Sequence, residues 1–103
     1  MATTPVMRNR VERRLDLLLA EVEELPATAA DWDQLEEWEQ ASISLEWSHL
    51  MADYLTQLDS RYRAGEMAPD QQARYQDLLC KLREQFPIVE RLNLYRPPVS
   101  LAT

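Results

Sequence analysis

The chain has 103 residues and a formal net charge of −7, and it is 46% hydrophobic and 28% charged with a single glycine. This balance excludes a disordered chain, and the abundance of strong helix formers favours one all-α domain over residues 1–103. The one cysteine excludes an internal disulfide and a structural zinc cage. No stretch approaches the roughly 20 apolar residues of a membrane span, and no signal peptide is recognised, so we expect a cytoplasmic protein with no membrane contact.

The charges are segregated along the sequence. Residues 1–14 carry a net charge of +3, residues 15–60 hold twelve acids and no lysine or arginine, and residues 61–103 carry +2. A nucleic-acid-binding protein needs a basic footprint, and this chain offers only a short one at its start. Nucleic acid is therefore not expected as a partner.

The first helix is predicted over residues 5–25. Thr4 can cap a helix whose first position is Pro5, and Pro26 is expected to end it. Apolar residues then recur at alternating spacings of four and three, which predicts a stripe that packs against another helix: Val11, Leu15, Leu18, Val22 and Leu25.

The second helix is predicted over residues 32–64, which would make it about 50 Å long. Asp31 with Gln34 resembles a capping box, and Gly65 suits the position after the last turn. Two faces are apolar: one carries Leu35, Trp38, Leu45 and Ala52, and the other carries Ile43, Trp47, Leu50, Tyr54 and Leu58. Either the helix is sandwiched between two others, or one face forms a dimer interface anchored by a tryptophan.

The third helix is predicted over residues 69–92, and an extended proline-containing tail over residues 93–103. Its apolar stripe is Tyr75, Leu79, Leu82, Phe86 and Val89. Short connections make neighbouring helices antiparallel, so the predicted fold is an all-α, three-helix antiparallel (up-down-up) bundle with a long central helix. Equal rise per residue places Arg96 of the tail near Glu37.

The most unusual stretch is "DWDQLEEWEQ", residues 31–40. Its acids could bind a hard cation, dock a basic partner, or form the solvated first turn of a helix, where acids complement the macrodipole. Across the hairpin of the first two helices, facing residue numbers should add up to roughly 57. The stretch would then meet further acids between Asp16 and Glu24.

Glu46 and His49 are spaced as Glu-x-x-His, similar to the ligand pair of ferritin-like di-metal bundles. A symmetric dimer would double the pair, and Asp16 or Glu21 could complete the ligands. The other interpretation is that His49 is a packing residue on an apolar seam. Neighbouring side chains on one helix diverge, and a chain with one glycine offers no oxyanion loop, so we expect no catalytic residue and no enzyme.

Four arginines stand near the start of the first helix, against the preference of its macrodipole. A second copy packed antiparallel would set them beside the acidic end of the first copy. The prediction is a small acidic homodimer that acts through protein–protein contacts as an adaptor, inhibitor or antitoxin-like protein, without a cofactor. Its partners are itself and a basic protein surface, met by Arg10, Arg13, Arg14, Asp31, Asp33, Glu36, Glu37, Trp38, Glu39 and Trp47. The alternative is a metal-binding ferritin-like bundle that uses Glu46 and His49 in an oligomer.

Overall fold

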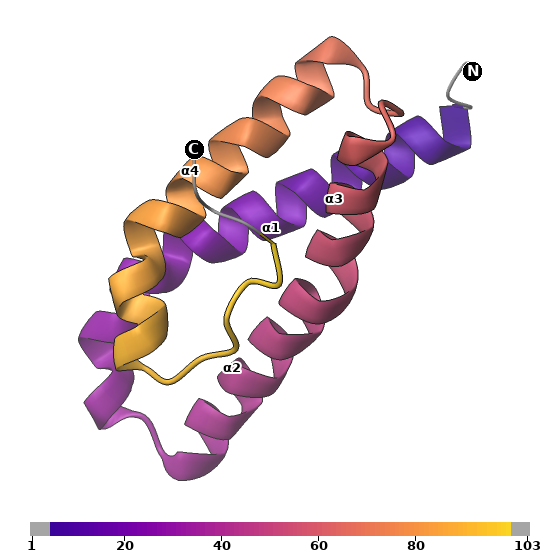
Figure 1. Ribbon diagram of the computed structural model, residues 1–103. Coiled ribbons are helices and arrows are strands. Elements are labelled where there is room, and N and C mark those ends of the chain that lie inside the picture. Colours follow the sequence, from indigo (N-terminus) through magenta and orange to yellow (C-terminus); the bar gives the residue numbers. More distant parts are fainter. Residues whose placement is uncertain (1–4, 100–103) are drawn as a thin grey trace.

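The computed structural model describes residues 5–99, except for the side chain of Met7, and these residues form helices and no strand (Figure 1). The elements are α1 (Pro5–Asp31), the 3-10 turn η1 (Trp32–Gln34), α2 (Glu37–His49), the π-helix η2 (Leu50–Leu55), α3 (Thr56–Arg63) and α4 (Pro69–Arg91). The predicted all-α class is confirmed. None of the described helices combines the length and the apolar character needed to cross a membrane. The predicted end of the tail, residues 100–103, lies outside the described residues.

Helix α1 is longer than predicted, because it continues through Pro26 to Asp31. The proline removes one backbone hydrogen bond, but alanines that favour a helix follow it. Ala29 is buried, and its carbonyl accepts a 3.4 Å hydrogen bond from the Arg91 guanidinium. The predicted end at Leu25 is therefore wrong, and so is the predicted cap, since the side chain of Asp31 makes no capping hydrogen bond.

Helix α2 consequently begins at Glu37, later than predicted. Glu36 precedes it in an extended conformation, and the side chain of Glu39 accepts a 3.1 Å hydrogen bond from the Glu36 amide, which satisfies this backbone donor at the start of the helix. The helical backbone then continues through η2 and α3 to Arg63. Gly65 follows with φ +72°, a left-handed conformation that glycine adopts without strain, as predicted.

Helices α1 and α4 lie side by side and run in the same direction (Figure 1). Their polar contacts join residues 58 to 63 positions apart along the whole length of the pair, among them Arg8 with Gln71 and Asp70, Glu12 with Arg74, Glu23 with Lys81, and Ala29 with Arg91. A nearly constant offset is what a parallel pair of helices requires, because both rise by the same distance per residue.

The contacts of α1 with the following helical run correct the predicted register. Arg14 contacts Gln57 and Glu21 lies beside Glu46, so the residue number on one helix rises as the number on the other falls. The prediction placed Glu21 opposite the stretch at residues 31–40 instead. It is wrong because α1 extends beyond Pro26, which moves the turn of the hairpin along the chain.

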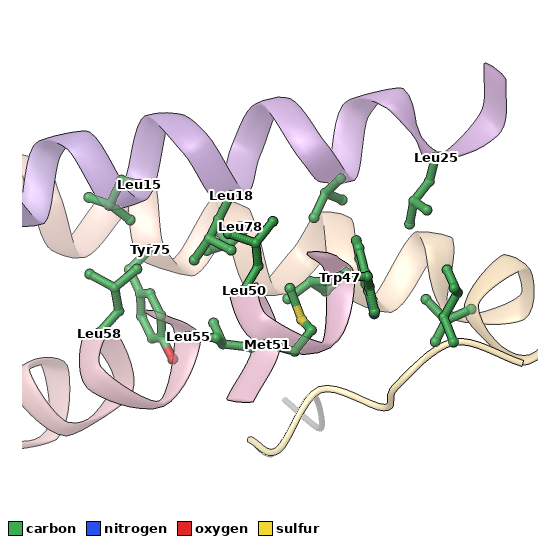
Figure 2. Packing of buried hydrophobic residues seen from close by; sticks show 14 of the residues in the cluster. Leu15, Leu18, Leu25, Trp47, Leu50, Met51, Leu55, Leu58, Tyr75 and Leu78 are labelled. Carbon is green, nitrogen blue, oxygen red and sulfur yellow. The ribbon is translucent and has the colours of Figure 1, made fainter. Parts of the chain in front are cut away.

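The core lies between α1, α4 and the run from α2 to α3, and Figure 2 shows the side chains pointing into it from these elements. The whole predicted stripe of α1 is buried, as are Trp47, Leu50, Met51, Leu55 and Leu58 from the run and Tyr75, Leu78, Leu82 and Val89 from α4. Each large apolar side chain removed from water contributes about 1.5–3 kcal/mol. The core therefore fixes one face of each helix.

The tail runs beside α2 (Figure 1), and it is bonded to Trp47 near the end of that helix rather than to its acidic start. Leu94 is buried, and the indole N–H of Trp47 donates a 2.8 Å hydrogen bond to the Tyr95 carbonyl. Arg96 pairs with Glu90 at 3.7 Å. The predicted position of Arg96 near Glu37 is therefore wrong, because the tail follows the core side of α2.

Candidate interaction surfaces

One face of α2 carries apolar side chains that no described element covers. Trp38 and Leu45 are 68% and 73% exposed, and Ala41 and Ser42 lie between them at helical spacing. We call these four residues the α2 stripe. The interpretation of a helix buried on two sides is wrong here, because this face is exposed, whereas the face that carries Trp47 is buried in the core.

The indole of Trp38 is held in place although it is exposed. Its N–H donates a 2.6 Å hydrogen bond to a carboxylate oxygen of Glu36, and the Glu36 amide is bonded in turn to Glu39. Asp33 and Glu37 are exposed beside this cluster. The predicted stretch thus presents a fixed aromatic ring within an acidic rim, and a fixed ring loses little side-chain entropy when it is covered.

Trp47, the other predicted anchor, is only 2% exposed and belongs to the core. Its ring packs within the chain, and its N–H is used by the tail. Of the two predicted anchors, only Trp38 is therefore accessible on the surface of the folded chain.

Ion pairs neutralise most acids of α4 and of the first part of α1, and they leave most acids of residues 21–46 unmatched. The pairs are Asp70 with Arg8, Glu12 and Asp16 with Arg74, Glu23 and Asp77 with Lys81, Asp59 with Arg63, Glu66 with Arg61, and Glu90 with Arg96. Within residues 5–99, no arginine or lysine pairs with Glu21, Glu24, Asp31, Asp33, Glu36, Glu37, Glu39 or Glu46. These eight acids lie between residues 21 and 46, and Glu84 on α4 likewise has no such pair among the described residues.

The carboxyl of Glu21 is destabilised in its charged form by burial and by the unpaired acids around it. Burial raises the pKa of its carboxyl above the ordinary value, and the charges of Glu46 and Glu24 raise that pKa further. A cation from outside the chain would relieve the repulsion among these three acids.

A basic groove lies at the other end of α1. It measures about 410 Å³ and is lined by Val6, Asn9, Arg10, Arg13, Arg14, Leu17 and Tyr54. Arg14 is hydrogen-bonded to Gln57 and stands 5.0 Å from the centre of the Tyr54 ring, so its charge is used inside the chain. Arg10 and Arg13 are exposed and have no ion pair in the described part of the chain.

An acidic groove of about 360 Å³ lies between the end of α1 and the start of α2. Its lining residues are Glu24, Ala27, Thr28, Asp31, Leu35 and Ile43. Both grooves thus combine apolar walls with charges of one sign, and the signs are opposite. Sequence reasoning found the charges but missed Val6, Leu17, Glu24 and Tyr54 as lining residues. A second stripe at helical spacing along α1 was the signal for the first three.

Glu46 and His49 do not face one another in a ligand cluster. Glu46 lies toward Glu21, and Nδ1 of His49 is 2.8 Å from a carboxylate oxygen of Asp53. The His49 side chain is 58% exposed, so its interpretation as a buried packing residue is wrong. Among the residues that the structure describes, no three Asp, Glu, His or Cys side chains are grouped as metal ligands would be.

No family model matches the chain, and no curated protein and no solved structure matches it significantly. The surfaces therefore have to be interpreted from their own chemistry. Two features stand out, namely the α2 stripe with its acidic rim and the pair of oppositely charged grooves along α1.

Proposed function

We propose that the protein is a non-enzymatic homodimer that acts through protein–protein contacts, as an adaptor, inhibitor or antitoxin-like protein, and that it docks a basic partner on the α2 stripe. The observation that carries this proposal is the exposure of Trp38 and Leu45 on one face of α2. Aromatic anchors with large contact areas dominate many interfaces. Two large apolar side chains that are so exposed on one helix face are typical of a surface that a partner covers.

The acidic rim supports a basic partner. Asp33, Glu36 and Glu37 lie beside the Trp38 end of the stripe, and none of them forms an ion pair with a lysine or arginine among the described residues. Complementary charge speeds encounter and selects among partners more than it adds affinity. A partner surface with an apolar centre and basic edges fits this arrangement.

The proposed scaffold is an up-down-up bundle with a long central helix from α2 through α3 and an extended tail. The nearly constant offset between α1 and α4 supports it, and so do the contacts of Tyr75 with Asp59 and of Glu21 with Glu46. In this scaffold α1 and α4 pack on the core side of the central helix. The opposite side is left for the partner.

The test compares three immobilised proteins in quantitative capture from native lysate. Wild type should retain partners whose contact surfaces are basic, and a Trp38→Ala, Leu45→Ala double variant should lose them. The matched control is Tyr95→Ala, which removes another exposed aromatic ring outside the stripe and should capture the same proteins as wild type. Raised salt should weaken capture, because exposed charge pairs are screened.

Identical capture by wild type and the double variant would contradict docking on the stripe. Metal analysis of purified protein separates the alternative class of function. Stoichiometric iron, manganese or zinc that disappears on His49→Ala would favour the metal-binding bundle over the proposed interaction protein.

A further inference from the structure

One face of α1 remains uncovered along the described part of the chain, while its other faces meet the core, α4 and the run from α2 to α3. This open face repeats at spacings of three and four residues, and all its members are exposed: Val6, Arg10, Arg13, Leu17, Ala20, Glu24, Ala27 and Asp31. The basic groove and the acidic groove both open along it.

The charges on the open face follow an order. Arg10 and Arg13 stand near the start, Leu17 and Ala20 occupy the middle, and Glu24 and Asp31 stand near the end. Within residues 5–99, Arg10, Arg13, Glu24 and Asp31 form no ion pair. A surface with this order is complementary to a copy of itself turned end over end.

We infer that the open face of α1 is the interface on which a second copy packs antiparallel, about a two-fold axis near Leu17 and Ala20. The inference rests on the proposed homodimer and names its contact surface. In this arrangement facing residue numbers add up to about 37, since both helices rise equally. Arg13 of each copy then lies opposite Glu24 of the other, and two-fold symmetry makes each pair occur twice.

The occupant is a second copy because the open face already carries the matching order of charges. A parallel copy would set arginine against arginine and acid against acid, which costs far more than it gains. The antiparallel copy brings Arg10 within one helical turn of both Glu24 and Asp31. It also supplies cations near Glu21 and Glu46, whose repulsion has no internal remedy among the described residues.

Charge reversal tests the interface directly. Arg13→Glu alone and Glu24→Arg alone each create two like-charged contacts in the dimer, and each should raise its dissociation constant at least about tenfold in sedimentation. The double variant Arg13→Glu, Glu24→Arg restores both pairs with the charges exchanged and should dimerise again. An equimolar mixture of the two single variants should also dimerise, because both pairs are then complementary.

The controls are Arg83→Glu and Glu84→Arg, which change the net charge equally on exposed positions of α4 and should leave the dimer intact. Circular dichroism should show all variants folded, since Arg13 and Glu24 are exposed. A wild-type monomer at high micromolar concentration and low salt would refute both the homodimer and this interface. A wild-type dimer that ignores the single reversals would refute the interface and leave the homodimer standing.

Discussion

The indole N–H of Trp47 donates a 2.8 Å hydrogen bond to the main-chain carbonyl of Tyr95, which joins α2 to a segment 48 residues later in the chain. This bond fastens a tail that has no helix or strand of its own over residues 94–99. Leu94 is buried beside it and Val99 packs on the core. The tail is therefore part of the fold rather than an appendage.

Replacing Trp47 with Phe should lower the free energy of unfolding by about 1–3 kcal/mol, because one hydrogen bond and part of a buried ring are lost. A chain truncated after Asn93 should lose about 2–3 kcal/mol, mainly from the burial of Leu94. Urea denaturation followed by circular dichroism measures both.

Combining Trp47→Phe with the truncation isolates the contribution of the hydrogen bond between α2 and the tail. In the truncated chain, Trp47→Phe should cost about 1 kcal/mol less than in the full chain, since its acceptor is already absent. Equal costs in both chains, or a truncated chain as stable as the full one, would show that the tail does not dock.

Tyr75 should contribute through its hydroxyl as well as its ring. The side chain is fully buried, and its hydroxyl donates a 2.7 Å hydrogen bond to the Asp59 carboxylate. Hydrogen bonds to charged groups contribute about 1.5–3 kcal/mol, so Tyr75→Phe should lower the free energy of unfolding by that amount at pH 7. The control Tyr62→Phe, at a half-buried hydroxyl that accepts a hydrogen bond from Gln76, should cost less.

The pH dependence of this difference has a definite sign. Burial, and then the bond to Asp59, raise the pKa of Tyr75 above its ordinary value of 10.0. The unfolded chain therefore loses this proton before the folded chain does, and the contribution of Tyr75 to stability is complete below pH 10 and falls above it. The gap between wild type and Tyr75→Phe should narrow between pH 10 and 11 by up to about 1.4 kcal/mol. A constant gap would contradict the raised pKa.

The buried residues of α1 could be predicted from the sequence, because the periodic spacing of its apolar residues indicates one buried face whichever helices pack on it. The end of α1 could not. The helix-breaking effect of Pro26 can be read from the sequence alone, whereas the burial of Ala29 and the hydrogen bond from Arg91 arise only in the folded chain. The register of the first hairpin then failed as a consequence, since it was counted from the wrong turn.

The candidate site divides in the same way. The acidic stretch and the basic start of α1 were visible as charge patterns. Which acids of α1 are neutralised was not visible, because the bases that pair with Asp16 and Glu23 come from α4. Trp38 and Trp47 each lie on an apolar face of the predicted second helix. Only the packing of α1 and α4 on one side of α2 decides that Trp47 is buried and Trp38 exposed.

Glu21→Gln should stabilise the monomer at pH 7. Burial, Glu46 and Glu24 raise the pKa of Glu21 above 4.5, so the unfolded chain releases this proton more readily than the folded one. Stability then falls as pH rises from about 4 through the raised pKa, and the neutral glutamine escapes that loss. Melting curves at a concentration where sedimentation shows monomers should give a gain of about 0.5 kcal/mol at neutral pH, and none near pH 4.

The matched control for this gain is Glu23→Gln, two residues away on α1. Glu23 is 2.6 Å from Lys81, so its neutral form should be less stable than wild type at pH 7. The two variants remove the same charge and are expected to have opposite signs. Stabilisation by both would point to net charge alone as the cause.

Gln71 should be the most sensitive polar position in the bundle. Its side chain is fully buried. Its amide nitrogen donates hydrogen bonds of 3.1 Å to the Glu12 carboxylate and 3.3 Å to the Arg8 carbonyl, and its amide oxygen accepts one of 3.1 Å from the Ala68 N–H at the start of α4. Gln71→Leu leaves these groups without their partner and should cost about 1–3 kcal/mol.

Gln71→Glu distinguishes the bond that the side chain accepts from the bonds that it donates. The carboxylate still accepts the bond from Ala68, but it faces Glu12 where an N–H donated before, so the variant should be less stable than wild type at pH 7 and recover part of the loss as the pH is lowered and the pair gains a proton. The neighbouring variant Gln72→Leu loses one bond to the Met67 carbonyl from a half-buried position and should cost less than Gln71→Leu. Chemical denaturation at pH 7 and pH 4 measures all three. Equal effects of the two leucine variants would mean that Gln71 does not join α1 to α4 as the distances indicate.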